Sequence, residues 1–323
     1  MKIVKTIILC STLLLFNSCQ NSKTENEKIP GIILENMDTS VDPKDDFYNY
    51  VNGNWMKTNT IPDDESRWGG FGVLRKTTRQ DVLEIIKTAQ INDNYKEGSD
   101  QKKALLIFET KLDTIARNKA GIKPIQHLLD AIEGITNIDE LQTVYATITG
   151  VSAPFAGIGA NPDLNDSSVN TAWVFPGGLG LQRDYYIDQD DKTKDIRKDY
   201  LKHVSKMFQF IGYNNTDADN AANLILDLET KLAEPRLDKV ESRDIRNFNN
   251  PMTIDELESL TPSMNWNKLV LDLGIKKSLD QVLVMQPKYM KELNNVLETT
   301  SINDLKTLMK WSTIDNSANY LTT

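Results

Sequence analysis

The stretch 217-DADNAANLILDLETKLAEP-235 carries the clearest structural signal in this 323-residue chain. It is rich in alanine, leucine, glutamate and lysine, which favour a helix, and Pro235 cannot continue one. The sequence on both sides repeats this helical pattern, whereas strand signals are few. We therefore predict a mainly α fold, a multi-helix lobe with a small β element.

Further helices are predicted where apolar residues recur on one helical face or where a capping sequence occurs. Thr253 is followed three residues later by Glu256, the spacing of a capping box, and Asn137 and Glu140 form a cap pair. The predicted helices span residues 79–90, 101–118, 124–133, 137–149 and 192–211, and two more follow Thr253 and Ser301. Their expected inward faces are Val82, Ile85, Ile86 and Ala89 in the first, Leu105, Phe108, Leu112 and Ile115 in the second, and Tyr200, Leu201, Val204, Phe208 and Ile211 in the fifth.

Strand signals are confined to two short apolar runs. Residues 172–175, "AWVF", and residues 282–286, "VLVMQ", have the content of strands, and Pro287 ends the second run. The glycines of "GGLGL", residues 177–181, match neither a dinucleotide fingerprint nor a phosphate loop, so we expect them to form a turn. The β element is therefore expected around residues 155–186.

The N-terminus has the layout of an export signal. Residues 1–18 contain Lys2 and Lys5, no acid, and an apolar run too short to span a bilayer comfortably. The end of this segment, "LLFNSC", resembles a bacterial lipoprotein signal, in which cleavage leaves Cys19 as a lipid-modified N-terminus. A plain signal peptide with a chance cysteine is the alternative. Residues 19–40 begin polar and unpatterned, as in a flexible tether.

Charge and cysteine content narrow the classes of partner. Removal of residues 1–18 takes the net charge from −9 to −11, which argues against binding nucleic acid or anionic lipid headgroups. Membrane attachment is expected only through a lipid on Cys19, which would make the protein an exported cell-envelope lipoprotein. Since the other cysteine, Cys10, lies in the predicted signal, no intrachain disulfide is possible in the mature chain.

Two histidines limit the catalytic and metal-binding chemistry that is available. Neither His127 nor His203 belongs to an HExxH sequence, so both are expected to be ordinary helix residues rather than zinc ligands. There is also no CxxC pair and no GxSxG nucleophile elbow. Adjacent carboxylates at 45–46, 63–64 and 190–191 are expected to be solvated or capping acids. We therefore predict no catalytic residue, no metal ligand and no cofactor site in this chain.

One segment does suggest binding chemistry. In "IPDDESRWGGFGVLR", residues 61–75, two arginines flank two glycines and two aromatic residues. The segment is too rich in glycine to favour a helix. The guanidinium groups of Arg67 and Arg75 could hold a peptide carboxylate, while the glycines allow its close approach. Alternatively, Arg67 pairs with a local acid such as Asp64, and Arg75 lies on a solvated helix face.

The order of segments along the chain resembles the N-terminal half of the neprilysin and endothelin-converting-enzyme family of zinc metallopeptidases. The resemblance runs from about Val41 to the C-terminus. It is carried by residues 42–75, which include the arginine segment, by 101–132, "QKKALLIFETKLDTIARNKAGIKPIQHLLDAI", by 162–187, "PDLNDSSVNTAWVFPGGLGLQRDYYI", and by 228–266, which begin "LETKLAEPRLDKVESRD".

This resemblance implies a division of the chain and a role for the arginines. It implies that residues 41–78 pack on a catalytic domain and that residues 79–323 form the helical lobe that restricts access to the active site. In "SSRYGNFDILR"-like family sequences an arginine binds the C-terminal carboxylate of a peptide substrate. By motif it falls on Arg67, and Arg75 matches the second arginine. Gly72 departs from the family pattern, because it stands where an acidic residue braces that arginine.

The resemblance also implies a function that this chain cannot perform alone. The family's zinc is held by an HExxH helix and an ExxxD motif, and neither has a counterpart here. We therefore expect the N-terminal region of a zinc metalloendopeptidase for small peptides, inactive without a catalytic C-terminal half as partner. Zinc belongs to the full-length family enzyme. The alternative is a non-catalytic surface lipoprotein that binds peptides or a protein partner.

Overall fold

The computed structural model describes residues 31–65, 67–92, 94–276 and 279–322. The predicted signal peptide (1–18), Cys19 and residues 20–30 of the predicted tether lie outside these ranges. The chain divides into two compact units, Met1–Ser99 and Asp100–Thr323. Residues 79–99 group with the first unit.

The described part of the first unit contains one short turn and two helices. These are the 3₁₀ turn η1 (Leu34–Asn36), α2 (Phe47–Thr58) and α3 (Gly70–Asn92). Asp46 caps α2 by accepting a hydrogen bond from the backbone N–H of Asn49 at 2.9 Å, as expected for a capping acid.

Asp38 connects the segment after η1 to α2. Its carboxylate pairs with Lys57 at 2.5 Å, and its backbone N–H donates to the carbonyl of Tyr50 at 2.9 Å. A Cβ at Gly53 would lie only 2.7 Å from the Asp38 Cβ, so glycine is required for this approach. The hydrogen bonds from Lys57 and Ser40 lower the pKa of Asp38 to about 2.

The helix α3 begins earlier than the sequence predicted. The sequence predicts a helix over residues 79–90 and treats residues 61–75 as too rich in glycine to favour one, yet α3 starts at Gly70. The backbone N–H of Val73 donates to the carbonyl of Gly69 at 3.0 Å, which closes the first turn. Glycine destabilises a helix most in its interior. It is better tolerated in the first turn, where the backbone N–H groups have no partner within the helix.

The second unit is mainly helical with a small sheet, as the sequence predicted. In chain order its elements are α4 (Asp100–Leu112), α5 (Thr114–Ala120), α6 (Lys123–Glu133), α7 (Ile138–Ile148), β1 (Ala156–Pro162), β2 (Asn170–Pro176), α8 (Arg183–Ile187), α9 (Asp191–Phe210), α10 (Asn215–Ala233), the 3₁₀ turns η2 (Glu241–Arg243) and η3 (Ile245–Phe248), β3 (Pro251–Met252), α11 (Ile254–Leu260), α12 (Trp266–Asp272), β4 (Val282–Val284), α13 (Pro287–Thr299), α14 (Ile302–Ser317) and η4 (Ala318–Tyr320).

The sheet has the strand order β1-β2-β4-β3. The pairs β1–β2 and β3–β4 are antiparallel, while β2 and β4 are parallel. The two predicted runs became β2 and β4, but the sheet also recruits β3 at residues 251–252. The β element is therefore not confined to residues 155–186.

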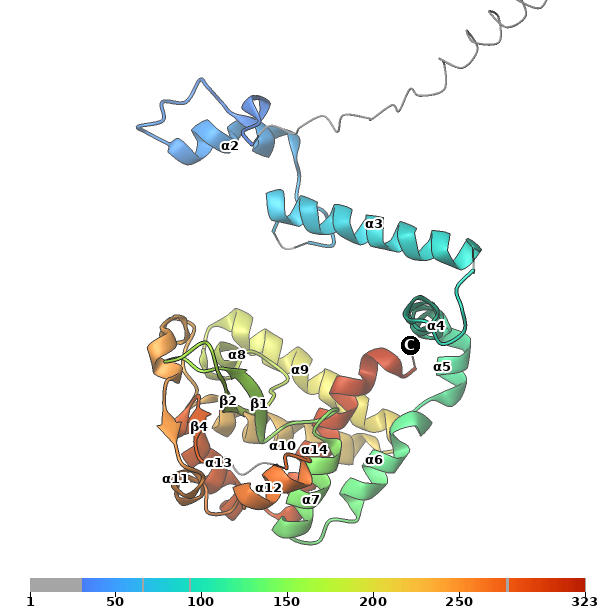
Figure 1. Cartoon of the computed structure of the whole chain (residues 1–323), viewed down its shortest axis with the longest axis vertical. Coiled ribbons are helices and arrows are strands. Elements are labelled where there is room, and N and C mark those ends of the chain that lie inside the picture. The colour runs from blue at the N-terminus through green and yellow to red at the C-terminus, as the bar shows by residue number, and fades with distance from the viewer. Residues whose placement is uncertain (1–30, 66, 93, 277–278, 323) are drawn as a thin grey trace, which may run out of the picture. The chain divides into compact units, whose positions relative to one another are not determined.

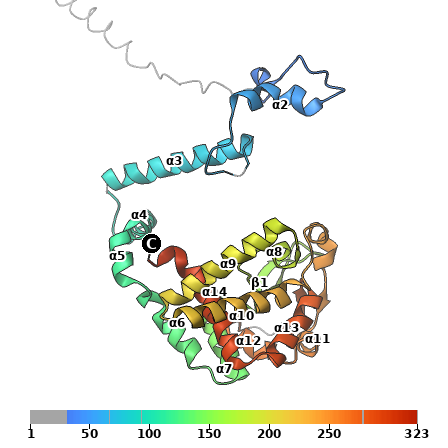
Figure 2. The same ribbon diagram turned by 180° about the vertical axis from the view of Figure 1, so that it is seen from behind.

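The helix α10, formed by the stretch that opened the sequence analysis, lies at the centre of the second unit. Figures 1 and 2 show it enclosed by α9, α14 and α13 in both views. Its buried apolar residues form one face of the core: Ala218, Ala221, Ala222, Ile225, Leu228, Leu232 and Ala233. This burial excludes a large apolar area from water, which is the main source of stability for the unit.

Local capping predictions are confirmed. Asn137 accepts a hydrogen bond from the N–H of Glu140 at 2.9 Å, and Thr253 and Glu256 form both bonds of a capping box. Ser301 caps α14 and Asp190 caps α9. These features depend on residues three positions apart, so the sequence contains all the information they need.

The prediction for residues 101–118 is wrong in one respect. Asp113 ends α4 and caps α5, because its carboxylate accepts a hydrogen bond from the N–H of Ala116 at 2.8 Å. Of the predicted inward face only Leu105 is buried, whereas Leu112 and Ile115 are 61% and 83% exposed. The predicted face of residues 79–90 is similarly open, with Val82 and Ile85 exposed.

A buried carboxylate joins α10 to four neighbouring segments. The Oε1 atom of Glu229 accepts hydrogen bonds from the backbone N–H of Gly180 at 3.0 Å and the indole N–H of Trp311 at 3.2 Å. Its Oε2 atom accepts from the hydroxyls of Tyr186, at 2.8 Å, and Tyr200. Burial raises the pKa of Glu229, and the four donors oppose that effect.

We expect Glu229→Ala to lower the free energy of unfolding by more than about 3 kcal/mol, because three buried side-chain donors and the backbone N–H of Gly180 lose their acceptor. Urea denaturation followed by circular dichroism measures this change. The matched control is Asp227→Ala, an exposed acid on the same helix, which should change stability by less than about 0.5 kcal/mol. Equal losses in both variants would contradict this account.

Candidate functional site

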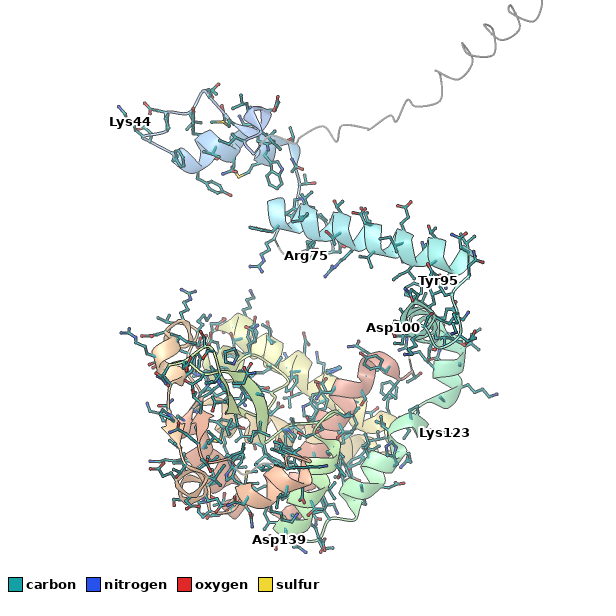
Figure 3. The ribbon with its side chains drawn as sticks, in the orientation of Figure 1. Lys44, Arg75, Tyr95, Asp100, Lys123 and Asp139 are labelled. Carbon is teal, nitrogen blue, oxygen red and sulfur yellow. The ribbon has the colours of Figure 1, made fainter. Side chains whose placement is uncertain are left out.

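The predicted arginine pair lies in the first unit, around the start of α3. Arg67 precedes the helix and is exposed, and Arg75 projects from its second turn (Figure 3). The Nη2 atom of Arg75 pairs with Glu65 at 2.8 Å, and both residues retain contact with solvent. Arg75 therefore lies on a solvated helix face, as the alternative interpretation of the sequence predicted, and in addition it pairs with a local acid.

Gly72 and Trp68 fix the shape of this segment. A Cβ at Gly72 would lie 2.9 Å from Cε3 of the Trp68 indole, so the indole packs against the bare backbone of the first turn. The Nζ atom of Lys76 lies 5.7 Å from the centre of the same indole ring. Position 72, where the family pattern would place an acidic residue, is thus a glycine that allows Trp68 to pack against the backbone.

The two histidines lie on helices of the second unit. His127 is exposed on α6, and the Nε2 atom of His203, on α9, lies 3.8 Å from the carboxylate of Asp315. Across the described ranges there is no group of three or more histidine, cysteine, aspartate or glutamate residues that could hold a metal ion. The residues that the structure describes therefore do not fit the zinc ion that the family resemblance implies.

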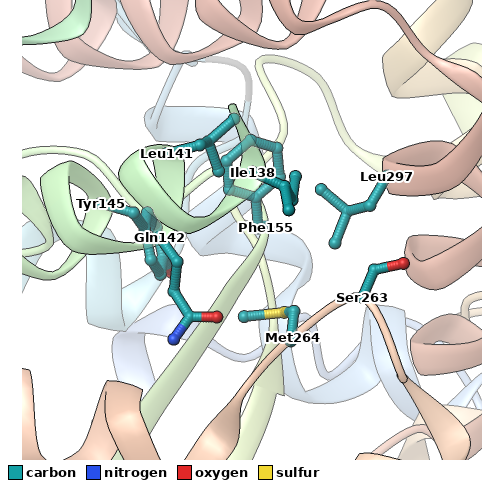
Figure 4. A pocket seen from close by; sticks show the side chains of 8 residues that line it. All are labelled: Ile138, Leu141, Gln142, Tyr145, Phe155, Ser263, Met264 and Leu297. Atoms are coloured by element: carbon teal, nitrogen blue, oxygen red, sulfur yellow. The ribbon is translucent and has the colours of Figure 1, made fainter. Parts of the chain in front are cut away.

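One hollow in the second unit offers packing rather than chemistry. The hollow between α7 and α13 is lined mainly by apolar side chains such as Ile138, Leu141 and Leu297 (Figure 4). The side-chain amide of Gln142, which also lines this hollow, is already hydrogen-bonded to the backbone of Asn265. Its N–H donates to the Asn265 carbonyl at 2.8 Å, and its oxygen accepts from the Asn265 N–H at 2.9 Å.

Glu229 is the polar residue of structural importance that the sequence analysis did not identify. A signal for it was present, because Glu229 follows Ile225 by four residues and precedes Leu232 by three, on the apolar face of a helix. The GGLGL segment lies in the connection between β2 and α8, and Gly180 in it supplies one of the donors to Glu229.

The helices in the described ranges include none long and apolar enough to cross a membrane.

A comparison with protein families identifies the chain: the family model described as Peptidase family M13, in its N-terminal part, matches residues 43–323. The chain belongs to peptidase family M13. The resemblance to neprilysin and endothelin-converting enzymes is thereby confirmed, and the chain is an N-terminal region of that family's proteins.

Individual relatives agree with this assignment. Rat endothelin-converting enzyme 1 is 28% identical over 302 residues, covering 90% of this chain and 39% of the relative. A putative zinc metalloproteinase of Streptococcus gordonii is 24% identical over 281 residues, covering 86% of this chain and 50% of the relative. The chain thus spans half or less of the length of these curated relatives.

Solved structures share the fold. The zinc metalloprotease Zmp1 of Mycobacterium tuberculosis, solved with an inhibitor, superposes with a TM-score of 0.80 at 26% identity, covering 90% of this chain and 45% of Zmp1. The PepO protein of Lactobacillus rhamnosis, at 18% identity and a TM-score of 0.69, supports the fold alone. The mainly helical architecture is therefore that of M13 peptidases.

The packing of Trp68 on Gly72 predicts different effects of two glycine substitutions. Gly72→Ala should displace the indole and change the NMR signal of the Trp68 indole N–H, because its new methyl group would collide with the ring. Gly70→Ala, with no atom within 4 Å of the added Cβ, should leave that signal in place and stabilise α3 by at most about 1 kcal/mol. An unchanged Trp68 signal in Gly72→Ala would show that the contact is absent in solution.

Proposed function

We propose that this chain is the N-terminal region of an exported zinc metalloendopeptidase that cleaves small peptides and whose zinc is held by a separate catalytic half. The observation that carries the proposal is the family match over residues 43–323, together with relatives named as zinc metalloproteases that are about twice as long or longer. The second unit would restrict access to the active site, and Arg67 with Arg75 would bind the substrate carboxylate.

Exposed apolar residues support a protein partner of this kind. In the first unit Phe47 and Phe71 are 67% and 89% exposed, in the segment 41–78 that is expected to pack on the catalytic half. In the second unit Leu106, Ile107, Leu112, Ile115 and Tyr320 are exposed on α4, α5 and η4. Apolar surface gathered in this way favours association with another protein surface.

The catalytic half and the anchor can be sought directly. A reading frame encoding HExxH next to codon 323, or elsewhere in the genome, supports the proposal, and its absence from the genome counts against it. Metabolic labelling with palmitate tests the lipid anchor, since a Cys19→Ser variant should lose the label. If the purified chain is monomeric and binds no hydrophobic dye, the alternative of a stand-alone lipoprotein gains support.

Alone, the purified chain is expected to retain no stoichiometric zinc and to cleave no peptide, because the sequence has no HExxH and the described residues offer no metal-binding group. Elemental mass spectrometry after dialysis and chromatography of a peptide mixture measure both properties. M. tuberculosis Zmp1 treated in parallel is the positive control. Zinc retention with an activity that a chelator abolishes would refute this prediction.

The arginine pair is expected to favour peptides with a free C-terminal carboxylate. Arg67→Ala should weaken binding of such a peptide about tenfold, the effect of losing one charge-assisted hydrogen bond, and should not change binding of the C-terminally amidated peptide. Calorimetric titration measures both affinities. Arg79→Ala, an exposed arginine further along α3, is the matched control. The same affinity for both peptides in the unaltered chain would remove this role from Arg67.

A further inference from the structure

The strand β1 has one open edge. It is the first strand in the order β1-β2-β4-β3, so it pairs with β2 on one side, and no strand of the described residues lies on the other. An unpaired strand edge presents a row of backbone donors and acceptors.

The register defines which groups point outward. The N–H of Gly177 donates to the carbonyl of Phe155, and the N–H of Asp163 donates to the carbonyl of Val169, both at 3.0 Å. Because bonded pairs alternate along antiparallel strands, the odd-numbered residues between Phe155 and Asp163 bond to β2. The backbone groups of the even-numbered residues, including Ile158 and Ala160, therefore point away from the sheet.

These outward groups are available for binding. The N–H of Ala156 donates to the Tyr145 hydroxyl at 3.3 Å, whereas no bond to the outward groups of Ile158 and Ala160 occurs within the described residues. Ala160 is exposed, and β1 contains no charged residue. Natural edge strands usually carry a lysine, a proline or a bulge that prevents pairing with another chain. In β1 the residue of this kind is Pro162, at the end of the strand.

One face beside the edge is apolar. Phe175 lies over the glycines of β1, since a Cβ at Gly157 or Gly159 would lie 3.5 or 3.3 Å from its ring. The Phe175 ring is partly exposed and stacks on Trp173 with ring centres 6.3 Å apart. A chain added beside β1 would therefore meet an aromatic surface at every second residue on this face.

We propose that the open edge of β1 binds an extended peptide by backbone pairing, with an apolar side chain at alternate positions. Outward groups two residues apart repeat every 6.6 to 6.8 Å or so, a spacing that an extended main chain matches. The edge uses none of the arginine segment, so this proposal and the proposed function succeed or fail separately.

The test uses the purified whole chain and a fluorescein-labelled heptapeptide in which threonine alternates with valine and phenylalanine. Ala160→Pro removes the outward N–H without touching the bonds to β2, so it should weaken binding at least tenfold in fluorescence anisotropy. Ala160→Ser keeps that N–H and should bind like the unaltered chain. The same peptide N-methylated along both edges should not bind.

Amide hydrogen exchange gives a second measurement that needs no variant: the peptide should slow exchange at Ile158 and Ala160. Absence of binding by the unaltered chain up to about 1 mM peptide, or unchanged affinity in a folded Ala160→Pro variant, overturns the proposal. So does sedimentation showing that the unaltered chain is a dimer that Ala160→Pro dissociates, because the edge would then be occupied by a second copy.

Discussion

The Glu229 carboxylate is the interaction that ties the central helix α10 to four other segments of the second unit. A charge in an apolar core is costly unless every lone pair is satisfied, and here two hydroxyls, an indole and a backbone amide meet it. Each donor comes from a different part of the chain: the glycine turn, α8, α9 and α14. Moving any of these segments away from α10 would break its hydrogen bond to the Glu229 carboxylate, and this energetic cost holds the segments in place.

Close packing explains two glycines of the GGLGL segment, Gly177 and Gly180. A Cβ at Gly180 would overlap the hydroxyl of Tyr200, and a Cβ at Gly177 would overlap the backbone at Pro154. The segment that contains them forms the connection between β2 and α8. The reason for glycine at these positions is tertiary, since Tyr200 lies twenty residues further along the chain and the donors converge only in the folded unit.

Apolar periodicity predicted helices well and burial less well. In α9 the predicted inward residues Tyr200, Val204 and Phe208 are buried, because α10 and α14 cover them. The same kind of pattern in α4 leaves Leu112 exposed, and α5 leaves Ile115 exposed. An apolar periodicity indicates which face of a helix is apolar, but it does not indicate whether another part of the same chain packs against that face.

By itself the sequence determined the helical class, the caps at Asn137, Thr253 and Ser301, the strands β2 and β4 and the family, because these rest on local spacing and on motif order. The identity of the arginine pair as a candidate site also came from motif order. Only the tertiary structure decided the glutamate core, the parallel pairing of β2 with β4, the helical start at Gly70 and the open edge of β1. These depend on contacts between residues far apart in the chain, or on how a glycine fits its neighbours, which no local pattern encodes.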